Sequence, residues 1–223
     1  METQQDGQTD ESHFLALPFD FVPGGAIFDC DGTLADTMPL HYRAWCDTLS
    51  PLGCPFPEDQ FYAWGGSTAE EIIERLNALH GLHIDAAATA HAKEHLYRTL
   101  IPRIAPVAAI VAEAERLYAA GCPLGVASGG MHLMVEETLK TLGIRSLFRT
   151  IVAADDVERG KPDPEPFLTV AQHLGVAPEA CVVYEDSPAG FEAARRAGMR
   201  VVDVRPHLER IRDDAEQALD ETK

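Results

Sequence analysis

Five short apolar runs recur along the chain, and none of them alternates between apolar and polar residues. An unbroken apolar run is typical of a strand that is buried on both faces of a parallel sheet. The runs lie at residues 25–30, 123–128, 150–155, 181–186 and 200–204. We therefore predict a five-stranded parallel sheet.

Helix-length amphipathic stretches separate most of these runs, and they end in glycine after alanine or leucine, a common helix-stop signal. They lie at 105–121, 131–143, 163–175 and 187–198. Strands that alternate with helices predict an α/β fold, doubly wound and Rossmann-like, with helices on both faces of the sheet.

The connection after the first predicted strand is much longer than a simple crossover needs. It spans about 70 residues without a strand pattern, and its helical stretches lie at 38–53, 57–66, 67–81 and 85–101. We predict that residues 37–103 form a small helical cap domain, inserted into a core domain of residues 22–36 and 104–223. The polar, acidic leader, residues 1–21, is expected to be poorly ordered.

Composition narrows the choice of partners and compartment. The 223 residues carry a formal net charge of −18, which disfavours nucleic acid and anionic membranes because both attract clustered Lys and Arg. No apolar run approaches the roughly 20 residues of a membrane span. The five cysteines show no CxxC spacing, and the N-terminus does not have the form of a signal peptide. We expect a cytoplasmic protein with reduced thiols, a monomer or weak homodimer that binds a small molecule.

Chemically active side chains follow four of the predicted strands. In chain order they are Asp29, Asp31, Ser128, Lys161, Glu185 and Asp186. Taken singly, each has an ordinary structural explanation: a polar turn for the aspartates, a helix N-cap for Ser128, a solvated lysine, and an acid pair at a helix start. In an open α/β sheet, however, ligands bind outside the carboxyl ends of the strands. The shared placement therefore favours a single site.

Four segments carry a resemblance to a known family. FDCDGTLADT (28–37), VASGG (126–130), GKPDPEPF (160–167) and VVYEDSPAG (182–190) resemble, in order and spacing, the signature motifs of the haloacid dehalogenase-like hydrolase superfamily. More narrowly, the chain is similar to the branch that holds β-phosphoglucomutase and small sugar-phosphate phosphatases such as fructose-1-phosphatase. The resemblance covers roughly residues 22 to 206.

The resemblance implies separate roles for the two aspartates. Asp29 is implied to be the nucleophile that attacks phosphorus and forms an aspartyl phosphate, which divides a hard hydrolysis into two easier steps. Asp31 is implied to protonate the leaving oxygen and then to activate water. These opposite tasks require environments that separate the pKa values of the two carboxyls.

A dianionic phosphate approaches carboxylates only if their charge is offset, and Mg²⁺ is the cofactor that the resemblance implies. The implied ligands are the Asp29 side chain, the Asp31 backbone carbonyl, Asp186, and Glu185 directly or through water. Lys161 would add a fixed cation. Ser128, Gly129 and Gly130 would bind the phosphate through a hydroxyl and backbone N–H groups.

Residues of the predicted cap are harder to assign. Thr37 and His41 match positions that align the acid–base aspartate in the mutase-like branch, although His41 could equally lie on an exposed helix face. The loop with Gly66, Ser67 and Thr68 resembles a substrate-specificity loop. Lys93 and Arg98 could meet a sugar or a second anion, but solvated surface positions are favoured for both.

We predict a Mg²⁺-dependent phosphatase that acts on a small phosphorylated metabolite, most simply a sugar phosphate. The alternative is a β-phosphoglucomutase-type isomerase, but that branch uses an arginine in the cap loop where this chain reads Gly65 to Thr68. A non-enzymatic phosphate-binding protein is disfavoured, because a binding module needs no nucleophile.

Overall fold

The five predicted strands form a parallel sheet in the computed structural model, which describes residues 14–15, 21–65 and 67–208. They are β2 (Gly25–Phe28), β5 (Leu124–Ala127), β6 (Thr150–Val152), β7 (Cys181–Glu185) and β8 (Arg200–Asp203). Their order across the sheet is β8-β7-β2-β5-β6, so β2 lies between β7 and β5. This central position places the residues that follow β2 in the middle of the carboxyl edge.

A sixth strand extends the sheet at the β8 edge. β1 (Phe14–Leu15) pairs in parallel with β8. These two residues belong to the leader, residues 1–21, that was expected to be poorly ordered. Residues 1–13 and 16–20 lie outside the described part of the chain, so the expectation for the leader stays a prediction. A two-residue strand carries too little hydrophobic pattern to be recognised in a sequence.

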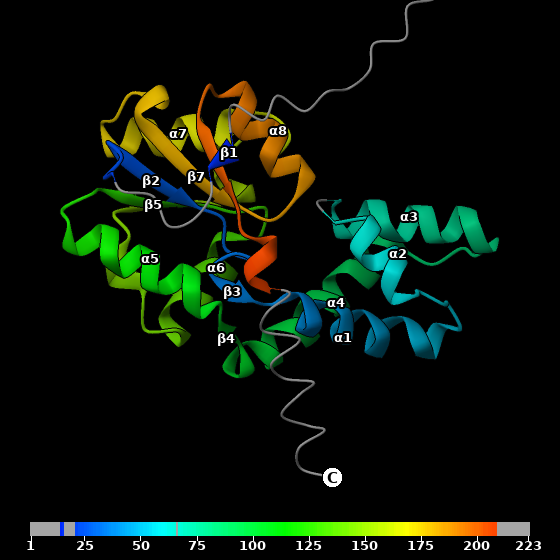
Figure 1. Cartoon of the computed structure of the whole chain (residues 1–223). Helices are drawn as coiled ribbons and strands as arrows, with labels where there is room; N and C mark the ends of the chain where they lie inside the picture. The colour runs from blue at the N-terminus through cyan, green and yellow to red at the C-terminus, as the bar shows by residue number, and fades with distance from the viewer. Residues whose placement is uncertain (1–13, 16–20, 66, 209–223) are drawn as a thin grey trace, which may run out of the picture.

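Helices cover both faces of the sheet (Figure 1). α5 (Ala108–Ala119) and α6 (His132–Thr141) pack on the face that receives Phe28 and Tyr184. α7 (Glu165–Leu174) and α8 (Pro188–Arg196) pack on the opposite face, with Ile27 and Val183. Successive strand residues thus enter different apolar clusters, as a doubly wound fold requires. The predicted fold class is confirmed.

The long connection after β2 is helical and has an apolar cluster of its own. It contains α1 (Met38–Leu49), α2 (Glu58–Ala63), α3 (Ala69–His80) and α4 (Ala86–Leu100), which lie beside the sheet (Figure 1). Trp45, Phe56, Phe61 and Leu76 pack together within it. β3 (Ala35–Asp36) and β4 (Ala105–Pro106) pair antiparallel where the chain leaves and re-enters the core. The exact domain boundaries at 37 and 103 stay a prediction.

Short 3₁₀ turns also occur at Ser50–Leu52, Ile101–Arg103, Arg145–Leu147, Ala154–Asp156 and Pro178–Ala180.

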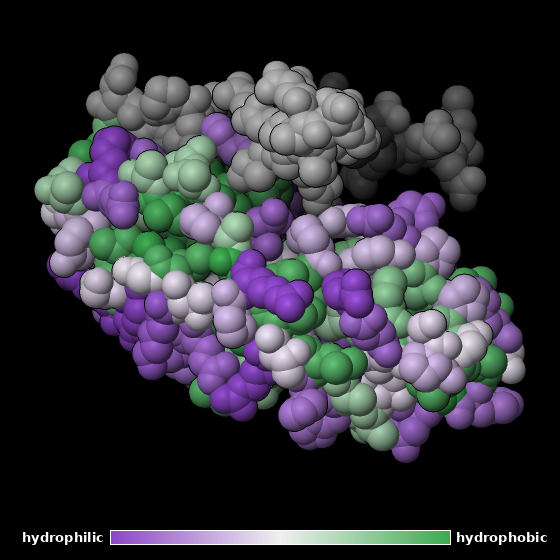
Figure 2. All heavy atoms as spheres, turned by 90° about the horizontal axis from the view of Figure 1, so that it is seen from below, coloured by the Kyte–Doolittle hydropathy of each residue, from purple (hydrophilic) through white to green (hydrophobic). Residues whose placement is uncertain are grey.

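On the face seen from below, hydrophilic residues are spread over both the core and the cap, with smaller hydrophobic patches between them (Figure 2). Among the described residues, no helix combines the length and the hydropathy needed to cross a membrane.

Candidate active site

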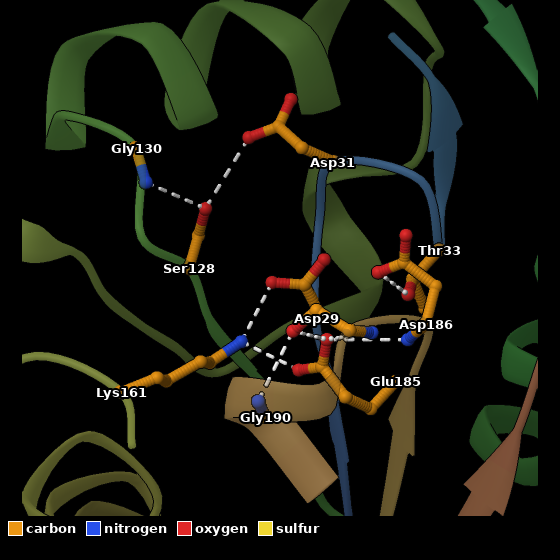
Figure 3. A network of polar contacts seen from close by, with 10 residues as sticks. Asp29, Asp31, Thr33, Ser128, Gly130, Lys161, Glu185, Asp186 and Gly190 are labelled. Carbon is orange, nitrogen blue, oxygen red and sulfur yellow. Dashed lines mark hydrogen bonds and ion pairs between the residues drawn. The ribbon is translucent and has the colours of Figure 1, made fainter. Parts of the chain in front are cut away.

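Asp29 lies at the carboxyl end of β2, where its backbone N–H donates to the carbonyl of Tyr184 in β7 (2.9 Å). Lys161 Nζ lies 2.7 Å from Asp29 Oδ1 and 2.7 Å from Glu185 Oε2, so one ammonium joins two carboxylates (Figure 3). The side chains of Lys161, Asp29 and Glu185 are only 9%, 7% and 1% exposed. Lys161 is therefore a buried ion-pair partner and not a solvated lysine.

Glu185 is held by the start of the segment that follows it. Its Oε1 accepts hydrogen bonds from the Ser187 hydroxyl (2.8 Å) and from the backbone N–H groups of Ser187 (3.0 Å) and Asp186 (3.1 Å). A Cβ on Gly190 would lie 2.0 Å from Glu185 Cδ, so the carboxyl group packs where only glycine leaves room. Ser187 is the N-cap of α8, so Glu185 binds the start of this helix through one oxygen and Lys161 through the other.

Asp186 packs against the turn that follows β2. Gly32 has a φ of 84°, which side chains rarely adopt, and a Cβ there would lie 2.3 Å from Asp186 Oδ2. The Thr33 hydroxyl approaches Asp186 Oδ1 at 3.5 Å. Glycine at position 32 is thus required both by the turn and by the approach of Asp186.

The three carboxylates form a group that fits a divalent cation. Asp29, Glu185 and Asp186 each offer an oxygen, and these oxygens lie within 4.8 Å of one another. Burial raises the pKa of Asp29 to about 8 despite Lys161, and burial together with the charges of Asp29 and Glu185 raises the pKa of Asp186 well above its ordinary value. A hard cation would offset this repulsion, and an all-oxygen set suits Mg²⁺.

Asp31 points away from this group, toward Ser128 (Figure 3). The Ser128 hydroxyl lies 3.5 Å from Asp31 Oδ2 and accepts from the backbone N–H of Gly130 at 3.1 Å. Ser128 is not a helix N-cap, because Met131 holds that position for α6. The two aspartates are therefore only two residues apart but occupy different environments.

His41 approaches Asp31 from the cap. Its Nε2 lies 3.6 Å from Asp31 Oδ1, and its Nδ1 lies 2.8 Å from Lys93 Nζ. An ammonium only donates, so we assign the imidazole proton to Nε2, which faces Asp31. Burial and the charge of Lys93 hold the pKa of His41 below its ordinary value. The ring thus presents a neutral N–H donor to the carboxylate.

Of the two cap cations, Arg98 occupies the solvated position favoured for it, whereas Lys93 does not. The Lys93 side chain is 5% exposed and also contacts Glu94 at 2.8 Å. It is buried because α4 packs against α1. Arg98 Nε donates to Glu137 of α6 at 3.1 Å, so it joins the cap to the core. The contact of Lys93 with His41 was not predicted, because 52 positions separate the two residues in the sequence.

Thr37 is buried at the N-cap of α1, yet its hydroxyl makes no helix-capping bond. Burial alone would raise the pKa of Asp31, but contacts with His41 and with the Thr37 hydroxyl, together with the charge of Lys93, hold that pKa below its ordinary value. The structure thus gathers Thr37 and His41 around Asp31.

Ser67 and Thr68 of the predicted specificity loop make local contacts within the cap. Gly66 lies outside the described residues. Thr68 caps α3, accepting from Glu71 N–H at 3.2 Å, and Ser67 N–H donates to Trp64 at 3.1 Å. Among the described residues, no hydrogen bond or ion pair joins Ser67 or Thr68 to Asp29 or Asp31. Gly129 and Gly130 follow Ser128, and a Cβ on Gly130 would lie 3.3 Å from Asp31 Oδ2.

Comparison with known proteins agrees with this geometry. A sequence profile of the family described as haloacid dehalogenase-like hydrolase matches residues 26–204. The fructose-1-phosphate phosphatase YqaB of Escherichia coli is 37% identical over 182 residues, which cover 81% of this chain and 96% of that protein. The β-phosphoglucomutase of Bacillus subtilis is 31% identical over 186 residues, 80% of this chain and 81% of that one.

A solved structure leads to the same family. CbbY from Rhodobacter sphaeroides, in complex with phosphate, superimposes with a TM-score of 0.70 at 30% identity, covering 81% of this chain and 85% of that one. Because the profile spans most of the chain and the relatives are matched over most of their length, the chain belongs to the haloacid dehalogenase-like hydrolases, in the branch that holds β-phosphoglucomutase and sugar-phosphate phosphatases.

Proposed function

We propose that the protein is a Mg²⁺-dependent phosphatase that hydrolyses a small sugar phosphate through an aspartyl-phosphate intermediate. One observation carries the proposal: two carboxylates from a single turn lie in different environments. Asp29 lies against Lys161 beside other acids, whereas Asp31 lies between Ser128 and His41. A nucleophile must be ionised and a general acid protonated, whereas without ligands burial raises the pKa of Asp29 to about 8 and contacts with His41 lower that of Asp31. The proposed roles therefore need a cation beside Asp29 and a phosphate beside Asp31, which would shift the two pKa values in the required directions.

In the first step, an oxygen of Asp29 attacks phosphorus, and the bond from phosphorus to the sugar oxygen breaks. Asp31 gives its proton to that leaving oxygen. A bound phosphate dianion disfavours a second negative charge beside it, so we expect it to raise the pKa of Asp31 and favour the protonated acid. In the second step, Asp31 takes a proton from water as the water attacks the aspartyl phosphate, which releases phosphate and restores Asp29.

The remaining residues bind and orient the phosphate. Mg²⁺, held by Asp29, Asp186 and the Asp31 carbonyl with Glu185 directly or through water, would supply positive charge for the phosphate oxygens. Lys161 would contribute a fixed cation to the same oxygens. Ser128 and the backbone N–H groups of the glycines after it would donate to the phosphate.

The substrate class rests on the relatives. Proteins named as phosphatases of fructose 1-phosphate, of validoxylamine A 7'-phosphate and of hexitol phosphates are 33% to 37% identical to this chain. A mutase is the second candidate, since β-phosphoglucomutases are also similar. We favour hydrolysis because Gly65 to Thr68 supply no arginine to hold a second phosphate.

The test is a phosphate-release screen across sugar phosphates, nucleotides and phosphorylated acids with Mg²⁺ present. We expect a sugar phosphate to be the best substrate. Asp29→Asn should lower turnover by about 10³-fold or more, whereas Asp47→Asn, which alters an exposed cap ion pair, should not. EDTA should abolish turnover, and added Mg²⁺ should restore it.

Three outcomes would count against the proposal. Full activity of Asp29→Asn would exclude the aspartyl phosphate, and full activity in EDTA would exclude the metal. Conversion of β-glucose 1-phosphate into glucose 6-phosphate faster than into inorganic phosphate would make the protein a mutase.

A further inference from the structure

We infer that Tyr97 is a positioning residue for the acid–base carboxylate, because its ring is the platform that holds His41 against Asp31. The inference rests on the proposed function and extends it to a residue of α4 that lies 66 positions from Asp31 in the sequence (97 − 31). Tyr97 acts through His41 and does not itself touch the substrate.

The rings of Tyr97 and His41 are stacked, with centroids 3.7 Å apart and planes inclined by only 10°. Lys93 lies one helical turn before Tyr97 on the same face of α4, and its ammonium lies 5.3 Å from the Tyr97 ring centroid. One face of α4 therefore supplies both restraints on the imidazole. Lys93 determines which imidazole nitrogen of His41 accepts a hydrogen bond, and Tyr97 determines the orientation of the imidazole plane.

The contact that these restraints protect is a weak one. His41 Nε2 lies 3.6 Å from Asp31 Oδ1, just beyond hydrogen-bond distance. A small tilt of the imidazole would move the two atoms further apart, whereas a small shift toward Asp31 would form the hydrogen bond. A flat neighbouring ring that prevents tilting is therefore sufficient to decide whether His41 engages the carboxylate.

Tyr97 is itself held at the junction between the cap and the core. It is 2% exposed and packs with Ala35, Ala44, Ile101 and Ile104. Ala35 belongs to β3 and also forms an isolated bridge with Asp31. The platform beneath His41 is thus attached to the same turn that carries the carboxylate it serves.

The ring, and not the hydroxyl, carries this role. The Tyr97 hydroxyl is buried and has no hydrogen-bond partner among the described residues, and its burial raises its pKa. Phenylalanine would keep the stacked surface, whereas leucine would remove it and retain apolar bulk. Comparing the two variants therefore distinguishes a role of the aromatic ring from a role of the hydroxyl.

The experiment compares two leaving groups. A nitrophenolate departs without a proton, whereas a sugar alkoxide needs the acid, so a misplaced Asp31 should slow the sugar phosphate more than p-nitrophenyl phosphate. The measured quantity is kcat/KM, which ends at the first irreversible step and so excludes hydrolysis of the aspartyl phosphate. We expect Tyr97→Leu to lower kcat/KM about tenfold more for the sugar phosphate, and Tyr97→Phe to keep the wild-type ratio.

Phe61→Leu is the matched control, since Phe61 is another buried cap aromatic and its ring contacts are with Tyr42, Phe56 and Tyr62. It should lower stability without changing the ratio of the two substrates. An equal loss for both substrates in Tyr97→Leu, or the same change of ratio in Phe61→Leu, would overturn the inference.

A second readout does not depend on turnover. A ring stacked at 3.7 Å should shift the carbon-bound imidazole protons of His41 upfield in a ¹H–¹³C spectrum. The shift should be present in wild type and Tyr97→Phe and lost in Tyr97→Leu. If no phosphate ester is hydrolysed but this pattern holds, the proposed function fails and the placement of His41 stands. If wild type lacks the shift, the platform does not exist in solution and the inference is wrong.

Discussion

Asp29 and Asp31 are supported in different ways. Asp29 has a 2.7 Å contact to Lys161, which has a second 2.7 Å contact to Glu185, and all three residues belong to the core. Asp31 is 25% exposed, with contacts of 3.5 Å to Ser128 in the core and 3.6 Å to His41 in the cap. Asp29, the proposed nucleophile, is thus held by the core alone, whereas the surroundings of Asp31, the proposed acid–base group, are completed only where the cap meets the core.

This difference indicates that the core and the cap play separate roles in the site. A buried ion pair is costly to break, because separating its partners leaves an uncompensated charge in the interior. Long contacts across a junction change with small movements of either side. A cap that opens to admit substrate and closes to exclude water would therefore leave Asp29 unchanged and would alter the surroundings of Asp31.

The largest effect should come from the core side. Lys161→Met would leave two buried carboxylates without their shared cation, so we expect about 3–5 kcal/mol less unfolding free energy and about 10²–10³-fold lower turnover. Chemical denaturation and phosphate release measure the two losses. The matched Lys140→Met removes an exposed partner of Glu136 and should change stability by about 1 kcal/mol or less. Similar losses in both variants would show that the core site is not specially held.

Gly190→Ala should disturb the core side of the site through a steric clash. The new Cβ would overlap Glu185 Cδ, and displacing that carboxyl group should lower the unfolding free energy by about 1–3 kcal/mol and reduce activity. Gly160→Ala is the matched control, since its Cβ would meet nothing within 4 Å. Thermal unfolding of both variants is the measurement, and equal melting temperatures would contradict the close packing of Glu185.

On the cap side, Lys93→Met should act on catalysis more than on stability. Without the ammonium, Nδ1 of His41 can carry the imidazole proton, so Nε2 is no longer obliged to present an N–H to Asp31. We therefore expect about tenfold lower turnover of a sugar phosphate. Arg43→Met removes an exposed cation from the same cap and should leave turnover unchanged. A similar loss of turnover in both variants would indicate an effect of the charge of the cap in general and not of the contact with His41.

The smallest effect is expected at the cap–core ion pair. Arg98 and Glu137 are partly exposed, so a double-mutant cycle with Arg98→Gln and Glu137→Gln should give a coupling of about 1 kcal/mol or less. Any change in kinetics should be a few-fold change in KM. A coupling several times larger would mean that this pair, and not the packing around Tyr97, holds the cap in place.

The core side of the site could be predicted because each residue follows a recognisable pattern. Asp29, Lys161 and Glu185 come at or just after apolar runs, and parallel strands bring such positions to one edge. The cap side could not be predicted to the same depth. The helical pattern of residues 85–101 does not reveal that Lys93 and Tyr97 turn toward His41. Strands of two residues, such as β1 and β3, were missed for lack of pattern.

By itself, the sequence determined the parallel sheet, the helical insertion and the acids at the carboxyl edge, because hydrophobic periodicity and strand direction act locally along the chain. Only the tertiary structure decided that Lys161 joins Asp29 to Glu185 and that His41 is held between Lys93, Tyr97 and Asp31. These contacts join residues far apart in the chain, and their geometry depends on how whole helices pack. The two halves of the site differ for that reason: one follows from strand ends, and the other from the way α4 and α1 meet the core.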